Sequence, residues 1–405
     1  MSLTTPLSMT IEDDRYSRLR LIPWWDEAKV HAAKVLVVGA GALGNEILKN
    51  LALLGFQKVV IVDMDRIERS NLSRAILFRD DQVGQYKADA AASSFRELGT
   101  GARVQSIVGG IDHHCGLGLF AWADIIVGGV DNREARLWMN RAAWKMNRPW
   151  IDGAIEGING VARVFLPGKA PCYECTLGET DWALLMNRMS CNLLLREASP
   201  AGKIATTPTI SSIIAGIQVQ EAMKLVHGLP TLASKAFIFE GLQHTSYVVE
   251  YTENPECMSH YTLNDVVHLK ERSSEITLAA LLERAQRDLG REEVVVEFSR
   301  DVIERLECPS CRAAEDVFRP VGTVSFEQGK CPNDGHLRTV TIRHSFAAGE
   351  AIGQRKLSEL GLPQFDVFTA RSAQREIGYL LGGDADAVLG ELGRAPLERY
   401  GEAKT

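Results

Sequence analysis

A glycine-rich turn between a short apolar strand and a helix constrains the fold of this chain more than any other feature. The turn reads Gly39-Ala-Gly41-Ala-Leu-Gly44, follows the β-branched run at 34–38 and opens a helix expected at 45–54. Glycines let a backbone approach phosphate groups closely, and the start of a helix offers free amides and the positive end of the helix dipole. This order of strand, turn and helix predicts a nucleotide site at the end of a buried parallel strand.

Strands and helices alternate through the first 255 residues or so. Alternation of this kind is typical of the α/β class, with a doubly wound, Rossmann-like and mostly parallel sheet. The further elements that we expect are strands at 58–62, 104–108 and 124–130, helices at 133–146 and 209–226, and a hairpin of strands at 236–240 and 245–251.

The pattern changes after about residue 262. A chain of 405 residues exceeds the ~250–300 residues at which one core stops growing, so two domains are expected. We place them at 1–261 and 262–405. The second would be a smaller α+β domain with a helix at 278–289 and strands at 293–298 and 338–343, followed by a weakly patterned end rich in glycine and alanine.

Charge and cysteine content restrict the partners and the compartment. A net charge of −7 means that the chain has no excess of basic residues with which to bind nucleic acid. No run approaches the ~18 apolar residues of a membrane span, and the first 14 residues lack the apolar core of a signal peptide. We therefore expect a cytoplasmic protein. Thiols stay reduced there, so the eight cysteines are expected to serve metal binding, catalysis or burial.

An acidic residue follows the glycine-rich turn at the distance that a nucleotide site requires. Asp63 ends the second expected strand, 19 residues after Gly44, where a carboxylate can hold ribose hydroxyls. Taken alone, this pattern is equally typical of an NAD-dependent oxidoreductase.

Further polar residues favour a triphosphate over a nicotinamide. Arg74 ends the segment Asn71-Leu-Ser-Arg74, Lys87 follows it, and Asp131-Asn132 lies just beyond an expected strand. Cations stabilise the charge that develops on phosphates, and an aspartate can hold a Mg²⁺ ion that bridges their oxygens. The combination indicates ATP as the nucleotide.

These motifs, together with Arg15-Tyr-Ser-Arg18 near the start, stand in an order and at a spacing that resemble a known family. It is the family of ubiquitin-activating enzymes and their bacterial relatives, the ThiF- and MoeB-type adenylyltransferases of thiamine and molybdopterin synthesis. The resemblance covers about residues 12–260. It implies an enzyme that uses ATP to adenylate the C-terminal carboxylate of a ubiquitin-like or sulfur-carrier protein, with release of diphosphate.

The resemblance also implies roles for individual residues. Asp63 would hold the ribose, Asn71, Arg74 and Lys87 would bind the phosphates, and Asp131 would hold Mg²⁺. Arg18 would reach the γ-phosphate of the ATP bound to the other subunit, which implies a homodimer. The full set of predicted nucleotide-binding residues is Gly39, Gly41, Gly44, Asp63, Asp65, Asn71, Arg74, Lys87, Asp131 and Asn132.

Two cysteine-containing pairs have the spacing of zinc ligands. Cys172-Tyr-Glu-Cys175 is the first pair, and Cys257-Met-Ser-His260 is its expected mate. Spacings of C-x₂-C and C-x₂-H suit a tetrahedral Zn²⁺ ion. The resembling family places a cysteine pair at each of these points, and His260 departs from it while remaining an acceptable ligand. Four protein ligands would make the site structural.

A third pair begins a zinc-ribbon-like segment at 306–336. Cys308-Pro-Ser-Cys311 is followed by Cys331-Pro-Asn-Asp334-Gly-His336, where Asp334 stands in the place of an expected fourth cysteine. Either Asp334 or His336 would complete a second zinc shell. Two alternatives stay open: a ribbon held by apolar packing alone, and a pairing of its first two cysteines with the first pair of the chain.

The remaining cysteines are Cys115 and Cys191. We expect Cys115 to be structural. Cys191 lies in the segment that follows the first zinc pair, where some members of the resembling family carry a reactive cysteine, and Arg188 and Arg196 flank it. A thiolate at Cys191 would attack the acyl-adenylate and hold the carrier as a thioester. With Arg74, Lys87, Asp131 and Arg18 it completes the predicted catalytic set.

Four functions remain open at the level of sequence. The first is activation of a ubiquitin-like protein for conjugation in a bacterial system, in which residues after 262 would recruit the carrier or a conjugating enzyme. The second is activation of a sulfur carrier that ends at the acyl-adenylate. The third is an NAD-dependent oxidoreductase, and the fourth a non-catalytic adaptor. The extra ~140 residues favour the first, because simple sulfur-carrier activators of this type end soon after the second zinc pair.

Overall fold

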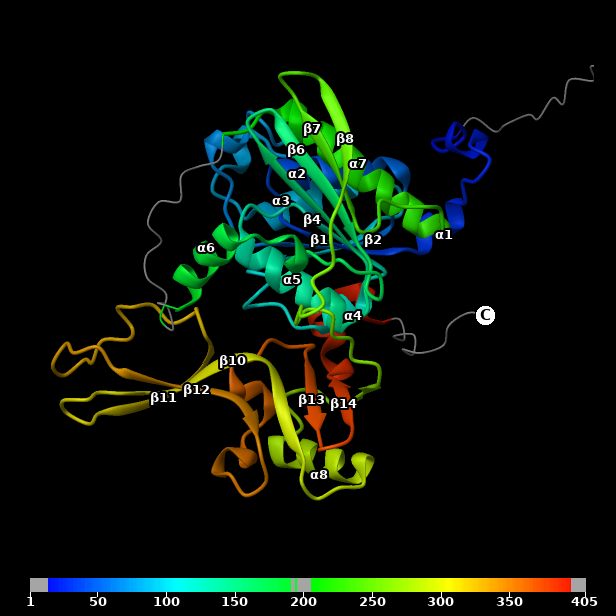
Figure 1. Ribbon diagram of the computed structural model, residues 1–405. Coiled ribbons are helices and arrows are strands. Elements are labelled where there is room, and N and C mark those ends of the chain that lie inside the picture. The colour runs from blue at the N-terminus through cyan, green and yellow to red at the C-terminus, as the bar shows by residue number, and fades with distance from the viewer. Residues whose placement is uncertain (1–13, 191–193, 195–204, 395–405) are drawn as a thin grey trace, which may run out of the picture.

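The computed structural model describes residues 14–190, 194 and 205–394. A large sheet and its covering helices form the upper part of the molecule in Figure 1, and a smaller sheet forms the lower part. Among the described residues, no helix combines the length and apolar character that a membrane crossing requires.

The large sheet contains eight strands in the order β3-β2-β1-β4-β5-β6-β7-β8. The first five strands of this order pair in parallel, and the last three pair antiparallel. Their bounds are β1 Lys34–Val38, β2 Lys58–Asp63, β3 Arg103–Val108, β4 Ile125–Gly128, β5 Trp150–Glu156, β6 Asn159–Phe165, β7 Lys235–Glu240 and β8 Thr245–Glu250. The α/β class and the doubly wound, mostly parallel sheet expected from the sequence are confirmed.

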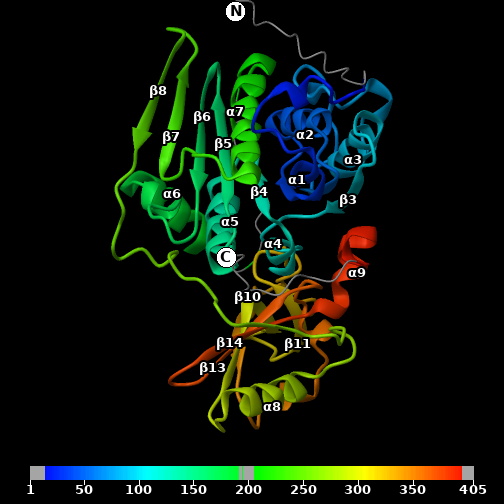
Figure 2. The ribbon, with the colours of Figure 1, turned by 90° about the vertical axis from the view of Figure 1, so that its right-hand side faces the viewer.

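Helices cover both faces of the sheet, as Figure 2 shows. Val35 and Val37 of β1 pack with α2, α3 and α7, whereas Leu36 and Val38 pack toward α4 and α5. A strand that is buried on both faces needs apolar side chains at every position, which explains its continuous β-branched run. The helices are α1 Glu27–Ala32, α2 Ala42–Leu54, α3 Lys87–Leu98, α4 Gly118–Trp122, α5 Arg133–Lys145, α6 Glu179–Ser190 and α7 Pro208–His227.

The ends of the longest helix show why these residues form it. The Thr207 side chain accepts a hydrogen bond from the Ile210 amide, and Pro208 occupies the first turn. Gly228 ends the helix in the left-handed conformation with φ +68°. These are typical start and stop signals of a helix.

The smaller sheet has the order β11-β10-β13-β14-β9, and β12 pairs with β10. Helix α8, Leu278–Leu289, packs its buried leucines against this sheet and has the bounds that the sequence predicts. Strand β10 is longer than the expected strand at 293–298 and ends directly before Cys308. The bounds are β9 Val266–His268, β10 Val295–Glu307, β11 Ala314–Pro320, β12 Thr339–Phe346, β13 Val367–Arg371, β14 Glu376–Leu380 and α9 Ala385–Leu389.

The described part of the weakly patterned C-terminal region, up to residue 394, contains regular elements that its sequence pattern does not indicate. It forms β13, β14 and α9, and residues such as Phe365, Val367 and Leu380 share one buried cluster with Leu119 and Phe120 of α4. These short elements obtain part of their apolar partners from the other part of the molecule, while Phe368 and Tyr379 pack within the smaller part. A periodicity within 365–392 therefore could not reveal them.

A polar contact joins the two parts beside the large sheet. Arg300 donates to the backbone oxygens of Asp112 (2.5 Å) and Cys115 (2.7 Å), and Asp366 accepts from the Leu117 amide (2.8 Å). Gly118 donates to the Phe365 oxygen at 2.9 Å. The connection that follows β3 is thus held by the C-terminal part of the chain.

Candidate functional site

A cleft of about 1340 Å³ opens at the carboxyl ends of β1, β2 and β4. Ligands bind at this end of the strands in open α/β sheets. The structure brings together nine of the predicted nucleotide-binding residues along its walls, namely Gly39, Gly41, Asp63, Asp65, Asn71, Arg74, Lys87, Asp131 and Asn132. The remaining one, Gly44, packs inside the turn, and Arg18 lies outside the cleft lining.

The three glycines of the turn have different roles. Gly39 has φ +92°, and a Cβ atom there would lie 2.6 Å from the Gly129 oxygen, while a Cβ at Gly44 would lie 1.9 Å from the Gly39 oxygen. These two positions therefore need glycine for the strand, turn and helix to pack. A Cβ at Gly41 would meet no heavy atom within 4 Å. The open space at Gly41 leaves room for a ligand beside the start of α2.

Asp63 stands at the base of the turn and is 8 % exposed. One carboxylate oxygen accepts from the Ala40 amide (2.7 Å) and the other from the Asp65 amide (2.8 Å). Burial raises the pKa of Asp63 above its ordinary value. These hydrogen bonds and the charge of Lys87 lower the pKa, but by less than burial raises it. Each oxygen has a second lone pair, so the carboxylate can still accept from ligand hydroxyls.

Two cations face this cleft from the other side of the turn. The Lys87 ammonium lies 2.8 Å from the Asp65 carboxylate, and its side chain is only 12 % exposed. Arg74 donates to the Ser70 oxygen at 2.6 Å. The Asn71 side chain accepts from the Glu68 amide at 2.9 Å, which fixes the short 3₁₀ turn that carries it. The cations are thus positioned before any ligand binds.

Asp131 and Asn132 follow β4, which ends two residues earlier than the expected strand at 124–130. Asp131 is exposed at the cleft. Asn132 caps α5, since its side chain accepts from the Ala135 amide at 2.7 Å. An exposed carboxylate that lines the same cleft as two cations suits a hard cation that is shared with phosphate oxygens.

Sequence reasoning missed a charge cluster whose two arginines, Arg136 and Arg163, line the same cleft. Asp152 of β5 is fully buried between Arg136 (2.9 Å) and Arg163 (2.6 Å). Burial alone would raise the pKa of Asp152, but the two arginines outweigh it and hold this pKa below its ordinary value. Asp152 and Arg163 are register partners on β5 and β6. An aspartate within the apolar run Trp150-Ile151-Asp152 was the available signal.

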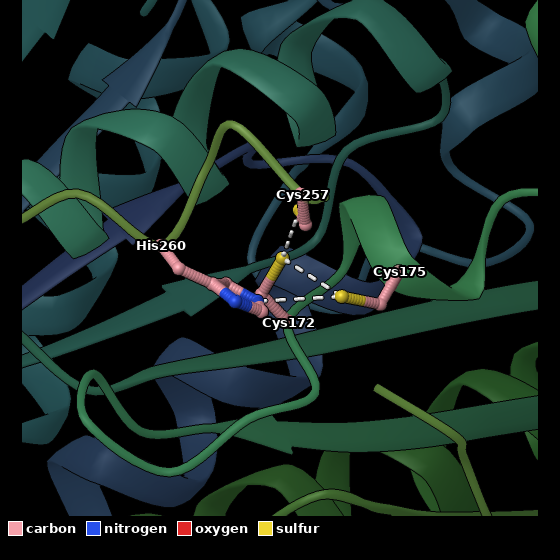
Figure 3. Close-up of side chains that lie close together, drawn as sticks. All are labelled: Cys172, Cys175, Cys257 and His260. Atoms are coloured by element: carbon pink, nitrogen blue, oxygen red, sulfur yellow. Dashed lines mark hydrogen bonds between the residues drawn. The ribbon is translucent and has the colours of Figure 1, made fainter. Parts of the chain in front are cut away.

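The first predicted set of metal ligands comes together beside the cleft. Figure 3 shows the side chains of Cys172, Cys175, Cys257 and His260 converging from two distant segments. The Cys172 sulfur lies 3.8 Å from that of Cys175 and 3.6 Å from that of Cys257. The Cys175 sulfur lies 3.3 Å from Nε2 of His260. Tetrahedral zinc with Zn–S bonds of about 2.3 Å places its sulfurs about 3.8 Å apart, so the cluster fits a metal ion.

Surrounding residues hold these two segments in register. Glu174 receives two hydrogen bonds from Arg141 (3.0 and 2.9 Å) and a short one from Ser259. The His260 ring stacks on Trp144 with centroids 4.5 Å apart. Each segment is thus tied to the other and to α5, which is the support that metal ligands usually require.

The second predicted set lies in the smaller part of the molecule. Cys308, Cys311, Cys331 and Asp334 place their ligand atoms within 4.8 Å of one another, as the first set also does. Both clusters have the residue types and the spacing to hold a metal ion. The pairing of Cys172 and Cys175 with the ribbon cysteines, left open by the sequence, is wrong.

Of the two remaining cysteines, the structure describes Cys115 but not Cys191. Cys115 is 2 % exposed, and burial raises its pKa to about 12, which fits the expected structural thiol. Cys191 and Arg196 lie outside the described residues, and the side chain of Arg188 is not among those described.

Comparison with known proteins identifies the family of this chain. Residues 14–259 match the ThiF family, which is more than half of the chain. The chain belongs to the ThiF family. The match contains the large sheet, the cleft and the three cysteines of the first metal cluster, and it ends one residue before His260.

Relatives of this ThiF-family chain include activating enzymes of ubiquitin-like proteins. The SAMP-activating enzyme E1 of Haloferax volcanii is 30 % identical over 252 residues, which cover 60 % of this chain and 87 % of that protein. The NEDD8-activating enzyme E1 catalytic subunit of Arabidopsis thaliana is 40 % identical over 157 residues, which cover 36 % of this chain and 34 % of that protein. The chain spans about a third of the length of the curated NEDD8- and SUMO-activating relatives it matches.

Solved structures share the fold of the ThiF-family region. Escherichia coli MccB with ATP has a TM-score of 0.52 and 24 % identity, and the match covers 62 % of this chain and 75 % of that one. At this identity the similarity concerns the fold.

Proposed function

We propose that this protein uses ATP to adenylate the C-terminal carboxylate of a ubiquitin-like protein. The observation that carries the proposal is the convergence of Asp63, Lys87, Arg74 and Asp131 around the glycine-rich turn in one cleft. The turn and Asp63 would also suit a dinucleotide, but two cations together with an exposed carboxylate suit a triphosphate with a bound Mg²⁺ ion better. The relatives named as NEDD8-activating and SAMP-activating enzymes support the same function.

Different cleft residues would bind the ribose, the phosphates and the Mg²⁺ ion of ATP. Asp63 would hold the ribose hydroxyls, and the open space at Gly41 would admit phosphates to the amides that begin α2. Lys87 and Arg74 would neutralise the phosphate charge as it grows. Asp131 would bind Mg²⁺ through its carboxylate. When bound, Mg²⁺ supplies charge stabilisation on the phosphate oxygens.

The reaction itself needs alignment more than proton transfer. The carrier carboxylate is already ionised at neutral pH, and one of its oxygens would attack the α-phosphorus of ATP. The new O–P bond forms as the bond to the bridging oxygen breaks, and diphosphate leaves with that electron pair. Fixed cations and a bound, oriented carboxylate account for this type of catalysis.

A thioester step at Cys191 would commit the carrier to conjugation. The Cys191 thiolate would attack the acyl carbon, forming an S–C bond while the bond to the adenylate oxygen breaks and AMP leaves. We expect a carrier-sized mass increase of the intact chain with Mg-ATP, removed by thiol reductant and absent in Cys191→Ala. Diphosphate release in the wild type without this adduct would instead favour activation of a sulfur carrier that stops at the acyl-adenylate.

Arg18 and a homodimer belong to the same proposal. Arg18 is exposed and precedes the short 3₁₀ turn Leu19–Leu21, away from the cleft lining of its own chain. This placement supports a role in the site of a second copy. Mixed Arg18→Ala and Asp131→Ala chains should regain about a quarter of wild-type activity, because random pairing gives half heterodimers with one intact site each. No recovery despite confirmed subunit exchange would contradict action in trans.

The zinc ions, the compartment and further partners are also proposals. We propose Zn²⁺ as the metal of Cys172, Cys175, Cys257 and His260, because three thiolates and an imidazole are its preferred ligand types. The enzyme would work in the cytoplasm, where these thiols stay reduced. A conjugating enzyme would be a further partner if Cys191 forms a thioester.

A further inference from the structure

The second cluster of metal-ligating side chains lies outside the region that matches the ThiF family. Cys308 follows β10 directly, and its partners Cys311, Cys331 and Asp334 come from the two turns of the ribbon-like segment. Cys308 and Cys331 are buried, while Cys311 and Asp334 are exposed. Two of the candidate ligands thus lie in the protein interior, and the other two lie on the solvent-exposed side of the cluster.

The two turns have the same backbone hydrogen bonds. In the first, the Cys308 amide donates to the Ala313 oxygen (2.8 Å), and the Arg312 amide donates to the Cys308 oxygen (3.0 Å). In the second, the Cys331 amide donates to the His336 oxygen (2.8 Å), and the Gly335 amide donates to the Cys331 oxygen (2.9 Å). Donor and acceptor are separated by the same number of residues in both turns, so the two turns have the same backbone hydrogen-bond pattern.

The conformations of the two turns agree as well. Arg312 and Gly335 occupy the same position in their turns, and both are in the left-handed region, with φ +62° and +75°. This conformation is uncommon for a residue other than glycine, so its presence at Arg312 is a constraint of the turn. The equivalence places Asp334 where the first turn has Cys311, three residues after the leading cysteine.

Distances within the cluster fit one tetrahedral ion. The Cys311 and Cys331 sulfurs are 3.5 Å apart, and the Asp334 carboxylate oxygens lie 3.5 and 3.4 Å from the Cys308 sulfur. With bonds of about 2.3 Å to sulfur and about 2.1 Å to oxygen, a tetrahedral zinc site has edges of about 3.5–3.8 Å. Three thiolates favour zinc over Mg²⁺ or Ca²⁺, which prefer oxygen ligands.

His336 lies in a supporting position. Its side chain is 62 % exposed, and its Nδ1 atom is 3.3 Å from the Asp334 carboxylate. Its amide also donates to the same carboxylate oxygen at 3.1 Å. In the first turn the equivalent position is Ala313, which has no ligand atom. His336 therefore orients Asp334 and does not belong to the ligand set.

We infer that Cys308, Cys311, Cys331 and Asp334 bind one Zn²⁺ ion as a closed structural site, with Asp334 rather than His336 as the fourth ligand. This site is separate from the proposed adenylation site, because none of its four ligands lines the cleft. Its four protein ligands leave no open position for a substrate.

The metal would also fix the surface on which Leu194 packs. Leu194 is 7 % exposed and lies in a small cluster with Ile303, Leu306 and Val324. A Cβ atom at Gly329 would lie 2.3 Å from Leu194 Cδ1, so the Leu194 side chain packs closely over this glycine. The chain segments that form this pocket lead directly into Cys308 and Cys331. Metal binding and the packing of Leu194 should therefore stabilise each other.

The test counts metal in the full-length chain purified with zinc and then exposed briefly to EDTA. Elemental analysis should find about two zinc ions per chain in the wild type and in His336→Ala, and about one in Asp334→Ala. Asp334→Cys restores the repeat of the first turn and should retain two. In thermal unfolding, Leu194→Ala should lower the Tm clearly in the wild type and much less in the Asp334→Ala background, because sites in one cooperative unit are non-additive.

Three results would overturn the inference. Loss of zinc in His336→Ala with full retention in Asp334→Ala would make His336 the ligand. A wild type that holds one zinc ion, unchanged by Cys311→Ser, would remove the ribbon site. Iron in place of zinc would overturn the identity of the metal. If Asp334→Ala does not fold, the zinc contents of Asp334→Cys and His336→Ala still decide, since loss from either one contradicts the assignment.

Discussion

Asp131→Ala is expected to lower diphosphate release about 1000-fold while leaving the fold intact. Asp131 is exposed at the cleft and follows β4 without capping a helix, so its removal creates no cavity. The loss would come from the transition state, where a single fixed electrostatic contact is worth about 10²–10³ in rate. Diphosphate release should be followed by a coupled assay with Mg-ATP and a ubiquitin-like protein that supports wild-type turnover.

Asp80→Ala is the matched control for this experiment. Asp80 is an equally exposed aspartate in the short 3₁₀ turn Asp80–Gln82, and it does not line the cleft. It should release diphosphate at nearly the wild-type rate. Near-normal release by Asp131→Ala under the same conditions would contradict the assignment of Asp131 as the Mg²⁺ ligand.

Cys257→Ser is expected to remove one zinc ion and to lower the Tm by about 10 °C. Structural zinc contributes about 10–16 kcal/mol in small zinc-dependent domains. The large sheet here has its own core, so only a part of that value should be lost. A loss of about 3–4 kcal/mol corresponds to about 10 °C, at ~2–4 °C per kcal/mol for a domain of this size. Differential scanning calorimetry and elemental analysis of the same sample provide both readings.

Met258→Ser introduces the same residue at the next position as a control. The Met258 side chain is 84 % exposed and has no place in the cluster of Figure 3. Its zinc content and Tm should match those of the wild type. If Cys257→Ser kept its full zinc content and Tm, the first cluster would not be a structural metal site.

Local patterns were sufficient to predict which residues meet in the cleft and in the two cysteine clusters. The turn at Gly39 has a fixed geometry, and Asp63 must end the neighbouring parallel strand, so their meeting follows from sequence order alone. Cys172 and Cys257 are 85 residues apart, yet the C-x₂-C and C-x₂-H spacings identify each half of the site. In both cases the spacing of residues within a short motif determines how their side chains or amides are arranged, whatever the rest of the fold.

Features that depend on distant contacts could not be predicted. The buried Asp152 obtains its two arginines from α5 and β6, and no spacing along the chain signals that arrangement. Strands β13 and β14 bury Val367 and Leu380 partly against α4, so their own alternation is weak. The choice between Asp334 and His336 depended on backbone hydrogen bonds in two turns, which residue types alone do not specify.

Adenylation of a protein carboxylate requires a free C-terminal carboxylate on the partner protein, and a matched pair of substrates shows whether this enzyme needs it. The chain is incubated with Mg-ATP labelled at the α-phosphate and with ubiquitin-like proteins ending in Gly-Gly, each prepared with a free C-terminal carboxylate and with a C-terminal carboxamide. We expect labelled acyl-adenylate and stoichiometric diphosphate only with a free carboxylate, and neither product with Lys87→Ala. Equal diphosphate release with carboxylate and carboxamide forms, or tight binding of NAD in place of ATP, would contradict the proposed adenylation.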